Sequence, residues 1–391
     1  MMGQKIRVGM IGIGNMGSGH ARNIVSGKCP QIELTAIADT NPARLEWAKE
    51  QFGAEVTYFA DAIEMLESGL IDSCIVAVPH YDHPKYAIAC MERGIHVMVE
   101  KPAGVYTLQV REMNKVSEQH PEVVFGLMFN QRTNCMYRKM RELVQSGKYG
   151  QIRRTNWMIT NWYRPQAYYD SGDWRATWSG EGGGVLLNQC PHQLDLWQWI
   201  CGMPVKVRSF MKFGQWHDIE VEDDVTTYVE YENGATGVFV TTTGDAHGTN
   251  RFEIQMDGAK LIAENDELTV EEFEVWESEF TKTNKVPFGK MNVKKIDAEL
   301  DGINDQHVGV LNAWAAAILE GTPLVADGKE GINGLMLSNA MHLSAFLGQD
   351  VTLPMDEELY YQELMKRVKT SRRKDVTETV FADTENTYKG N

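Results

Sequence analysis

The stretch Lys5-Ile-Arg-Val-Gly-Met-Ile-Gly-Ile-Gly-Asn-Met-Gly17 decides the fold. An apolar run ends there in the spacing GxGxxG, made of Gly12, Ile13, Gly14, Asn15, Met16 and Gly17, and a helical pattern begins at about Met16. In such a strand–turn–helix the first glycine permits a tight turn, the second lets backbone approach a pyrophosphate, and the third lets helix pack on strand. The helix N-terminus adds free N–H groups and a positive dipole end. The stretch therefore predicts a dinucleotide-binding unit, the alternative being a similar scaffold without a phosphate ligand.

Asp39 supports this prediction, because it ends the next apolar run, IELTAIAD. A carboxylate at this place accepts hydrogen bonds from an adenosine ribose diol and would repel a 2′-phosphate. Residues 40–43 are Thr-Asn-Pro-Ala, and the first arginine, Arg44, comes one helical turn later. We therefore expect NAD as the cofactor in preference to NADP.

Apolar runs and helical patterns alternate over residues 5–126, which predicts a parallel sheet covered on both faces. After residue 130 the pattern changes to an amphipathic helix, a strand over 151–163, alternating strands over about 206–280 with a hairpin at Tyr231-Glu-Asn-Gly234, and helices over 307–321 and 334–348. We predict an α/β protein with two domains. Residues 1–129 form an N-terminal Rossmann domain with a doubly wound parallel sheet. Residues 130–391 form an α+β domain for substrate binding and oligomerisation, with a large, mostly antiparallel, open-faced sheet and a peripheral tail of about 20 residues.

The bulk composition fits this picture and excludes some partners. A hydrophobic content of 43% and a charged content of 24% are typical of a globular protein. The net charge of −16 argues against nucleic acid and against an anionic membrane surface. No apolar run approaches the roughly 20 residues needed to span a bilayer, and the N-terminal run is interrupted by glycines, unlike a signal peptide. We expect a cytoplasmic protein.

The six cysteines show neither a CxxC pair nor a disulfide framework. Cys190 and His192 would be two metal ligands without a second pair nearby, so we expect no metal.

A second stretch, Val97-Met-Val-Glu-Lys-Pro-Ala-Gly104, runs from an apolar strand directly into Glu100, Lys101 and Pro102. Strand ends in α/β proteins face the ligand, so Lys101 is expected to point toward the cofactor, a solvated lysine being the alternative. The run Val76-Ala-Val-Pro-His80 ends at the same edge. The predicted cofactor contacts beyond the glycine loop and Asp39 are Val78, Pro79, His80, His83, Glu100 and Lys101. His83 fits a helix start better than a catalyst, and the turn at Pro79 has a plain strand-ending turn as its alternative.

These motifs, with the later GGGVLLNQCPHQLD of residues 182–195, together resemble the Gfo/Idh/MocA oxidoreductase family, which is named for glucose–fructose oxidoreductase and inositol dehydrogenase. The resemblance spans nearly the whole chain in the right order. It implies that Lys101 lies beside the nicotinamide and the substrate hydroxyl. A cation there would stabilise a developing alkoxide, and Pro102 biases Lys101 toward an extended backbone.

The family's second motif, GGGxLxDxGxHxxD, implies that His192 is a general base, and an unperturbed imidazole pKa near 6.5 suits that task. Two departures stand out: Asn188 replaces the family's frequent aspartate, and Cys190 replaces a glycine. An amide can orient a hydroxyl or His192, but it carries neither charge nor proton. If residues 188–192 are helical, Asn188 and His192 share a face, although Pro191 either interrupts or starts that helix. Asp195 either assists His192 or is a solvated or capping acid, and His192 itself has a packed structural histidine as its alternative.

The loop over residues 161–175, NWYRPQAYYDSGDWR, is the predicted substrate wall and is called the aromatic loop below. Aromatic rings stack on the C–H faces of sugars, while arginine and aspartate bind hydroxyls. The resemblance places a sugar pocket at this point of the chain, whereas an aromatic core or an oligomer contact is the alternative. The predicted substrate-binding residues are Tyr163, Arg164, Tyr168, Trp174, Arg175, Lys101, Asn188 and His192.

We therefore expect an NAD-dependent oxidoreductase that moves a hydride from a ring hydroxyl carbon of a sugar, glycoside or cyclitol to NAD, giving a keto-sugar. Lys101, His192 and Asn188 are the expected catalytic residues. A redox-neutral enzyme with retained NAD, which cleaves, eliminates or epimerises through a transient keto-sugar, uses the same motifs and stays open. A non-catalytic NAD-sensing protein is disfavoured because Lys101 and His192 are intact. A homo-oligomer, dimer or tetramer, is expected through the C-terminal sheet, because an open face is a liability in a monomer.

Overall fold

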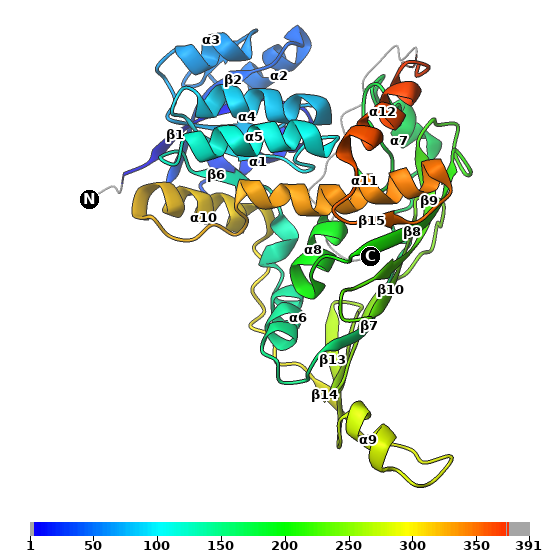
Figure 1. Ribbon diagram of the computed structural model, residues 1–391. Helices are drawn as coiled ribbons and strands as arrows, with labels where there is room; N and C mark the ends of the chain where they lie inside the picture. The colour runs from blue at the N-terminus through cyan, green and yellow to red at the C-terminus, as the bar shows by residue number, and fades with distance from the viewer. Residues whose placement is uncertain (1–3, 373, 375–391) are drawn as a thin grey trace.

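The structure, a computed structural model, describes residues 4–372 and 374 and contains two sheets joined by helices (Figure 1). The first sheet is parallel throughout, in the order β3-β2-β1-β4-β5-β6. Its strands are β1 (Ile6–Ile11), β2 (Ile32–Ala38), β3 (Thr57–Phe59), β4 (Ser73–Val76), β5 (His96–Val99) and β6 (Phe125–Leu127). This is the strand order of a Rossmann domain, and the predicted doubly wound sheet is confirmed.

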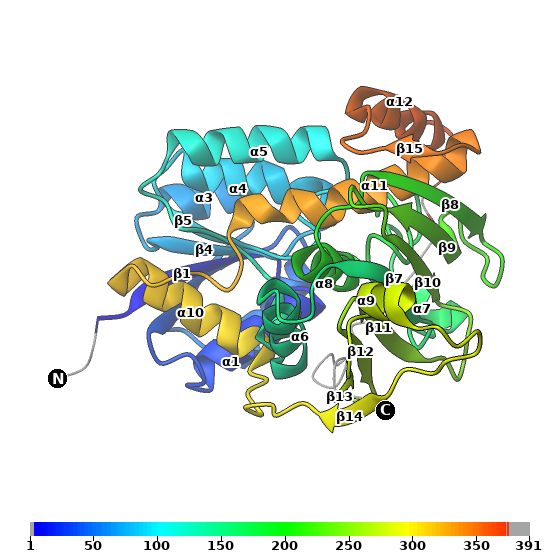
Figure 2. The ribbon, with the colours of Figure 1, turned by 60° about the horizontal axis from the view of Figure 1, so that its bottom comes forward.

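Helices cover both faces of this sheet, with α3, α4 and α5 on one side and α1 and α10 (Gln306–Glu320) on the other (Figure 2). The helices and 3₁₀ turns of this part are α1 (Asn15–Val25), α2 (Pro42–Phe52), α3 (Ala62–Glu67), η1 (His80–Asp82), α4 (His83–Met91), α5 (Thr107–Gln119) and η2 (Asn130–Thr133). Local chemistry sets their starts. Asn41 caps α2 by accepting the N–H of Ala43 at 3.0 Å, and Asp61 caps α3 in the same way.

The second sheet has nine strands in the order β14-β13-β12-β11-β7-β10-β9-β8-β15. All its pairs are antiparallel except β10 with β7, so the predicted mostly antiparallel sheet is confirmed. Its strands are β7 (Ile152–Ile159), β8 (Lys206–Phe213), β9 (Glu222–Glu230), β10 (Thr236–Thr242), β11 (Asn250–Met256), β12 (Ala259–Glu264), β13 (Glu267–Phe273), β14 (Val293–Asp297) and β15 (Val351–Thr352). The hairpin predicted at Tyr231–Gly234 joins β9 to β10.

Helices pack on one face of this second sheet (Figure 1). The remaining helices are α6 (Cys135–Gln145), α7 (Gln166–Asp170), α8 (Pro191–Cys201), α9 (Glu277–Thr283), α10 (Gln306–Glu320), η3 (Gly328–Glu330), α11 (Gly331–Leu347) and α12 (Glu357–Val368). Large aromatic side chains fill the layer between α8 and the sheet. Trp157 stacks on Phe252 with ring centroids 4.2 Å apart, and Trp197 stacks on Phe239 at 5.4 Å.

Helix α10 follows the second sheet in the sequence but packs against the first domain. A single boundary at residue 129/130 does not account for this return of the chain. Trp314 and Leu311 are fully buried in the same core as Val8 of β1. At the end of the helix, Gln31 donates to the carboxylate of Glu320 at 3.0 Å. The later part of the chain therefore completes the Rossmann domain as well as building the second one.

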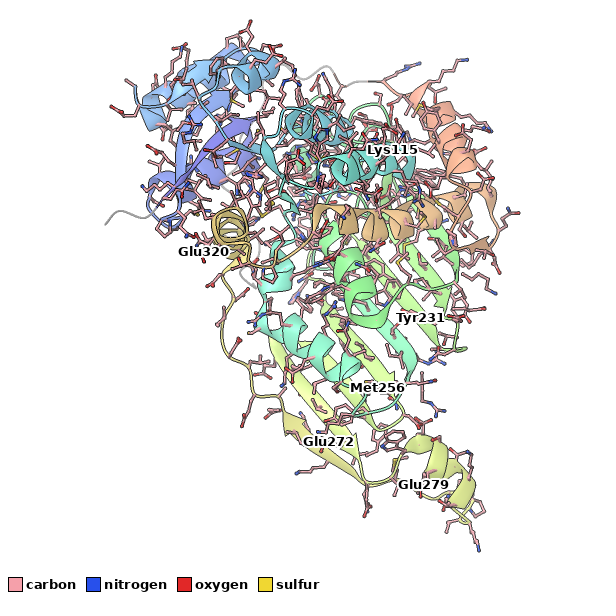
Figure 3. All side chains as sticks on the ribbon, turned by 60° about the vertical axis from the view of Figure 1, so that its left-hand side comes forward. Lys115, Tyr231, Met256, Glu272, Glu279 and Glu320 are labelled. Carbon is pink, nitrogen blue, oxygen red and sulfur yellow. The ribbon has the colours of Figure 1, made fainter. Side chains whose placement is uncertain are left out.

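The face of the nine-stranded sheet that points away from these helices carries exposed side chains. Phe210, Thr226, Val240 and Met158 lie side by side across β8, β9, β10 and β7, and Phe210 is 60% exposed. Figure 3 shows Glu279 of α9 at one end of the molecule, far from Glu320 of α10.

Most of the predicted peripheral tail lies outside the described residues. The part that is described runs beside the aromatic loop, since Lys374 Nζ donates to the carbonyl of Tyr169 at 3.2 Å and Ser371 donates to Glu220 at 2.5 Å. In residues 4–372 and 374, we find no helix with both the length and the apolar character needed to cross a membrane.

Candidate active site

The turn between β1 and α1 can be built only with glycine at two positions. A Cβ on Gly17 would lie 2.0 Å from the carbonyl oxygen of Gly12, and one on Gly12, whose φ is +89°, would lie 2.4 Å from Ala77 O. A Cβ on Gly14 would meet nothing within 4 Å, and Gly14 precedes α1 without any side-chain cap. The turn thus leaves open space directly in front of the free N–H groups of α1, which fits a dinucleotide pyrophosphate.

Asp39 stands at the end of β2 and is joined to the glycine loop. Its two carboxylate oxygens accept the backbone N–H groups of Ile13 and Asn41, each at 2.8 Å. Arg44 lies beneath the same loop, where its Nη2 donates to Ile13 O at 2.6 Å and to Ser18 Oγ at 2.8 Å. The Arg44 guanidinium also lies 4.0 Å from the ring centroid of Trp47. An arginine of α2 therefore supports the cofactor loop from below, a contact that the sequence pattern did not reveal.

The ends of β4 and β5 are tied together by histidine rings. His83, the first residue of α4, places Nδ1 2.6 Å from Pro102 O and Nε2 2.8 Å from Val78 O. His80 follows Pro79 in η1, and its Nδ1 lies 3.2 Å from the carbonyl oxygen of Glu181 in the second domain. Burial lowers the pKa of both imidazoles. These residues fix the strand ends and join the first domain to the loop before α8.

Glu100 is buried under the next turn. Its Oε1 lies 2.6 Å from His20 Nε2, and its Oε2 accepts the N–H of Lys101 at 3.1 Å. Burial would raise the pKa of Glu100, but the hydrogen bond and charge of His20, with smaller effects of His307 and Lys101, lower it to about 2. Glu100 thereby holds the backbone from which Lys101 projects.

Lys101 reaches across to the second domain, where its Nζ donates to the backbone carbonyl of Asn188 at 2.8 Å. Burial lowers the pKa of Lys101, whereas the carboxylates of Glu100 and Glu181 oppose that effect. The lysine is therefore held at the junction of the two domains.

His192 is also brought to this junction. It is buried at the start of α8, and burial and the charge of Lys101 hold its pKa well below the ordinary value. The neutral imidazole can accept a proton, although it is a weaker base here than in water. Pro191 begins α8, so Asn188 lies in the turn before the helix, and the two residues do not share a helical face.

Asp195 is neither a solvated nor a capping acid, so that reading of it is wrong. Its carboxylate forms a buried bidentate pair with Arg132 at 2.8 and 2.7 Å, and Arg132 also binds Glu330. This pair fixes α8 to η2. No sequence pattern signals this pair, because Arg132 lies 63 residues before Asp195 in the chain.

Four of the five predicted substrate-binding residues of the aromatic loop lie at this junction: Arg164, Tyr168, Trp174 and Arg175. The hydroxyl of Tyr168 accepts from Arg175 Nη1 at 2.9 Å and from Asn188 Nδ2 at 3.3 Å. The Arg175 guanidinium lies 4.6 Å from the Tyr168 ring centroid and 4.7 Å from that of Trp174, while Arg164 lies 5.2 Å from Tyr168. The ring of Tyr163 is 43% exposed, and its carbonyl accepts from Arg164.

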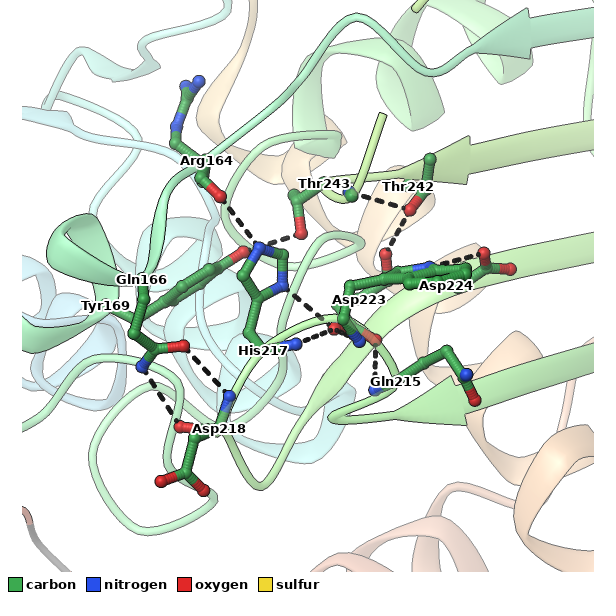
Figure 4. Close-up of polar contacts among 12 residues, drawn as sticks. Arg164, Gln166, Tyr169, Gln215, His217, Asp218, Asp223, Asp224, Thr242 and Thr243 are labelled. Atoms are coloured by element: carbon green, nitrogen blue, oxygen red, sulfur yellow. Dashed lines mark hydrogen bonds and ion pairs between the residues drawn. The ribbon is translucent and has the colours of Figure 1, made fainter. Parts of the chain in front are cut away.

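A buried histidine anchors the backbone of this loop (Figure 4). His217 Nδ1 lies 3.0 Å from Asp223 Oδ2, and its Nε2 lies 2.8 Å from the carbonyl oxygen of Arg164. Tyr169, whose ring packs against His217, donates its hydroxyl to Thr243 at 2.7 Å. The aromatic loop is therefore bound to β9 and β10 by polar contacts that the sequence did not suggest.

Glu181 is the main site residue that sequence reasoning missed. Its side chain is buried, its Oε2 accepts the N–H of Ala176 at 2.6 Å, and its Oε1 accepts the side-chain amide of Asn188. Burial raises its pKa, while Arg175 and these hydrogen bonds act in the opposite direction. The available signal was an acidic residue directly before three glycines.

A cavity of about 500 Å³ lies apart from this junction. It is lined by residues that include Arg132, Arg138, Arg141 and Trp199, but not by Lys101.

Within the described part of the chain, no three His, Cys, Asp or Glu side chains are grouped as a metal site would require. Cys190 Sγ instead lies 3.2 Å from Thr241 Oγ1.

A glycine turn for a dinucleotide, a lysine at the adjoining strand end and a histidine from a second domain define an NAD(P)-dependent oxidoreductase. Residues 6–126 match the oxidoreductase family with an NAD-binding Rossmann fold, and residues 137–262 match the GFO/IDH/MocA C-terminal domain. The chain belongs to the Gfo/Idh/MocA family.

Relatives within the family carry different substrate names. The myo-inositol 2-dehydrogenase of Thermotoga maritima is 24% identical over 343 residues, which are 86% of this chain and 95% of the relative. The D-glucoside 3-dehydrogenase of Escherichia coli is 27% identical over 252 residues, or 60% of this chain and 69% of the relative. The two family matches thus show the family, whereas the substrates named for its members differ.

Solved structures agree with this architecture. The WlbA dehydrogenase of Chromobacterium violaceum, in complex with NADH and UDP-GlcNAcA, superposes with a TM-score of 0.76 at 26% identity and covers 91% of this chain and 98% of its own. A levoglucosan dehydrogenase with NADH has a TM-score of 0.74 at 20% identity, covering 90% of this chain and all of its own, and supports the fold alone.

Proposed function

We propose that this protein is an NAD-dependent dehydrogenase that oxidises a ring hydroxyl of a sugar, glycoside or cyclitol to the ketone. The observation that carries the proposal is the junction at Lys101. A lysine from the end of β5 is hydrogen-bonded to Asn188 of the second domain, with His192 and the aromatic loop around it. A cation, a neutral imidazole and a wall of aromatic and guanidinium groups suit the oxidation of a polyhydroxylated ring.

The reaction divides between proton and hydride. His192 takes the hydroxyl proton of the substrate, and the ammonium of Lys101 stabilises the oxygen as it becomes an alkoxide. The glycine turn and Asp39 would hold NAD, which would supply the acceptor for the hydride of the same carbinol carbon and so allow a ketone to form. Asn188 orients the hydroxyl through its amide, and Arg175 with Tyr168 and Trp174 holds the remainder of the ring.

NAD is preferred over NADP in this proposal because of the chemistry around Asp39. Its carboxylate would repel a 2′-phosphate, and Arg44, the basic residue that follows it in α2, already donates to Ile13 O and Ser18 Oγ. The predicted contacts of Val78, Pro79, His80, His83 and Glu100 with the cofactor remain part of the proposal.

The substrate class rests on the aromatic loop and on the names of relatives. Two arginines lie within 5.2 Å of the Tyr168 ring centroid, which gives stacking and hydrogen-bonding groups together. Two relatives are named for myo-inositol and for D-glucosides, and both of these compounds are cyclic polyols, as expected for the substrate of this protein.

We further propose a homo-oligomer through the open face of the nine-stranded sheet, in the cytoplasm. Phe210, Met158 and Tyr228 are exposed on that face by 60%, 48% and 37%. The mass of the purified protein in solution, measured by light scattering, checks this part, and a monomer would contradict it.

The first experiment is absorbance at 340 nm with the purified protein, excess NAD, and a panel of inositols, sugars and glycosides. We expect NADH to accumulate over many turnovers with one of them. Lys101→Ala should lower kcat by about 10³-fold, because it removes the charge that stabilises the alkoxide. Lys115→Ala, at an exposed position of α5, is the matched control and should retain full activity.

NADH accumulation that is unaffected by Lys101→Ala would contradict the assignment of that residue. Failure of every compound to give turnover, with NAD released only on denaturation, would favour the redox-neutral alternative. A higher kcat/KM when NADP replaces NAD in this assay would contradict the reading of Asp39.

A further inference from the structure

Asn188 lies at this junction but can neither carry charge nor take up a proton at its amide. Yet Lys101 is anchored on the backbone carbonyl of this same residue, and an ammonium that loses water on burial needs a compensating charge. The buried carboxylate of Glu181, seven residues earlier, touches Asn188 directly.

Glu181 is held in place from several sides. Its backbone N–H donates to Thr177 O at 2.9 Å, and its carbonyl oxygen lies 3.2 Å from His80 Nδ1 in the first domain. One carboxylate oxygen accepts the N–H of Ala176 at 2.6 Å, and the other accepts from the amide of Asn188. With only 2% of the residue exposed, the carboxylate belongs to a built site and not to the surface.

The contact fixes which way the Asn188 amide points. A carboxylate only accepts hydrogen bonds, so the NH₂ group of Asn188 must face Glu181, and the same group reaches the Tyr168 hydroxyl at 3.3 Å. The amide oxygen then points away from both and is available to accept a hydrogen bond from a substrate hydroxyl.

The charges around the junction show what Glu181 does for Lys101. The carboxylates of Glu100 and Glu181 favour the charged lysine, while burial and two guanidiniums disfavour it. The titratable and charged groups that act on Lys101 or Glu181, or on which Lys101 acts, are Glu100, Glu222, Arg164, Arg175, His80, His83, Cys190, His192 and His307. Glu181 is the carboxylate that reaches the junction from the second domain and contacts Asn188.

We propose that Glu181 is a positioning residue that supplies the negative charge which Asn188 cannot carry: it orients the amide of Asn188 and keeps Lys101 protonated. This inference rests on the proposed dehydrogenase function. The charge and the group facing the substrate are thus divided between two residues, Glu181 and Asn188.

The test is a charge exchange between these two positions, with wild type, Glu181→Gln, Asn188→Asp and the double variant. Glu181→Gln keeps the shape but loses the charge, and should lower kcat about 100-fold through misplacement of the reacting groups, with a smaller change in KM. The alkaline limb of its pH–rate profile should move to lower pH, because Lys101 loses one of the carboxylates that keep it protonated. Asn188→Asp places two carboxylates in contact and should also lower kcat at neutral pH. The double variant restores a single carboxylate and should recover at least 10-fold of the loss, which cannot be expected if Glu181 only fills space.

A second measurement needs neither substrate nor cofactor. Competitive labelling of lysines with acetic anhydride, read by mass spectrometry over a pH series, gives the pKa of Lys101 in each variant. We expect a lower pKa in Glu181→Gln, its recovery in the double variant, and no change in Glu220→Gln, whose carboxylate binds Ser371 and not Asn188. Thermal unfolding of each variant checks that the fold is retained.

Either of two results overturns the inference: an unchanged Lys101 pKa in Glu181→Gln, or a double variant no more active than Glu181→Gln. If no sugar is oxidised by the wild type, the proposed function fails, but the labelling result still decides whether Glu181 controls the charge of Lys101.

Discussion

The cofactor side and the substrate side of this site are built in opposite ways. On the cofactor side, the glycine turn is shaped by backbone contacts between Gly12, Gly17 and Ala77, within one short stretch and the neighbouring strand. On the substrate side, the Lys101 side chain meets the backbone carbonyl of Asn188 across 87 residues of sequence, and the Asn188 side chain contacts those of Glu181 and Tyr168. Backbone geometry restricts residue type strictly, whereas a side-chain network can be assembled in many ways. A side chain added to either of these two glycines of the turn cannot be accommodated, whereas a substitution in the side-chain network can be compensated by a second one, as we propose for Glu181 and Asn188.

The largest expected effect tests the backbone half of this comparison. Gly17→Ala would place a Cβ 2.0 Å from Gly12 O, and no rotamer relieves a contact with backbone. We expect NADH binding, measured by fluorescence titration, to weaken by more than about 100-fold and the melting temperature to fall, because steric strain of this kind typically costs several kcal/mol.

Gly14→Ala is the matched variant. Its Cβ meets nothing within 4 Å in the protein, so stability should stay within about 0.5 kcal/mol of wild type, while NADH binding weakens because the pyrophosphate loses its approach. If Gly14→Ala binds NADH as well as wild type does, the second glycine does not face the cofactor and the account of the turn is wrong.

This contrast explains which features the sequence could predict. The strands of the parallel sheet, the glycine turn and the two confirmed sheets follow from local periodicity and from residue types that few conformations accept. The packing of Trp314 on the first domain, the pairing of Asp195 with Arg132, and the contact of Glu181 with Asn188 depend on tertiary placement. Asp195 was misread because an acid one turn after His192 has several possible partners, and only the fold brings Arg132 to it.

The cofactor side also depends on a residue that is remote in sequence from the glycine motif. This residue, His307, tests whether the cofactor side is built from local contacts alone. This residue of α10 lies with its ring 5.5 Å from that of His20, beside Glu100. Burial, with the charge of His20, lowers the pKa of His307 to about 4. In the unfolded chain His307 is protonated near pH 6.5, whereas in the folded chain it stays neutral to a lower pH. Its contribution to the free energy of unfolding is therefore complete above pH 6.5 and is lost as the pH falls toward 4.

We therefore expect His307→Asn to flatten the stability curve. Between pH 7.5 and 4.5, wild type should lose up to about 3 kcal/mol more free energy of unfolding than the variant, measured by urea denaturation. His247→Asn, at an exposed position, should follow the wild-type curve. Parallel curves for wild type and His307→Asn would mean that the cofactor side does not depend on this distant helix.

The smallest effect concerns the anchor of the aromatic loop on the substrate side. His217→Ala removes the hydrogen bonds to Arg164 O and to Asp223, which together bind the loop to β9. Hydrogen bonds of this kind contribute about 1.5 kcal/mol, so amide exchange over residues 164–170 should quicken roughly 10-fold, as followed by deuterium uptake, with exchange in α1 unchanged. Gln215→Ala is the control, because only the backbone N–H of Gln215 binds Asp223. The result matters for the comparison, since a local opening confined to the loop means that the substrate side is held by separable side-chain contacts. Exchange that rises throughout the second domain would instead make His217 part of the core, and the loop could not then vary independently of the sheet that carries it.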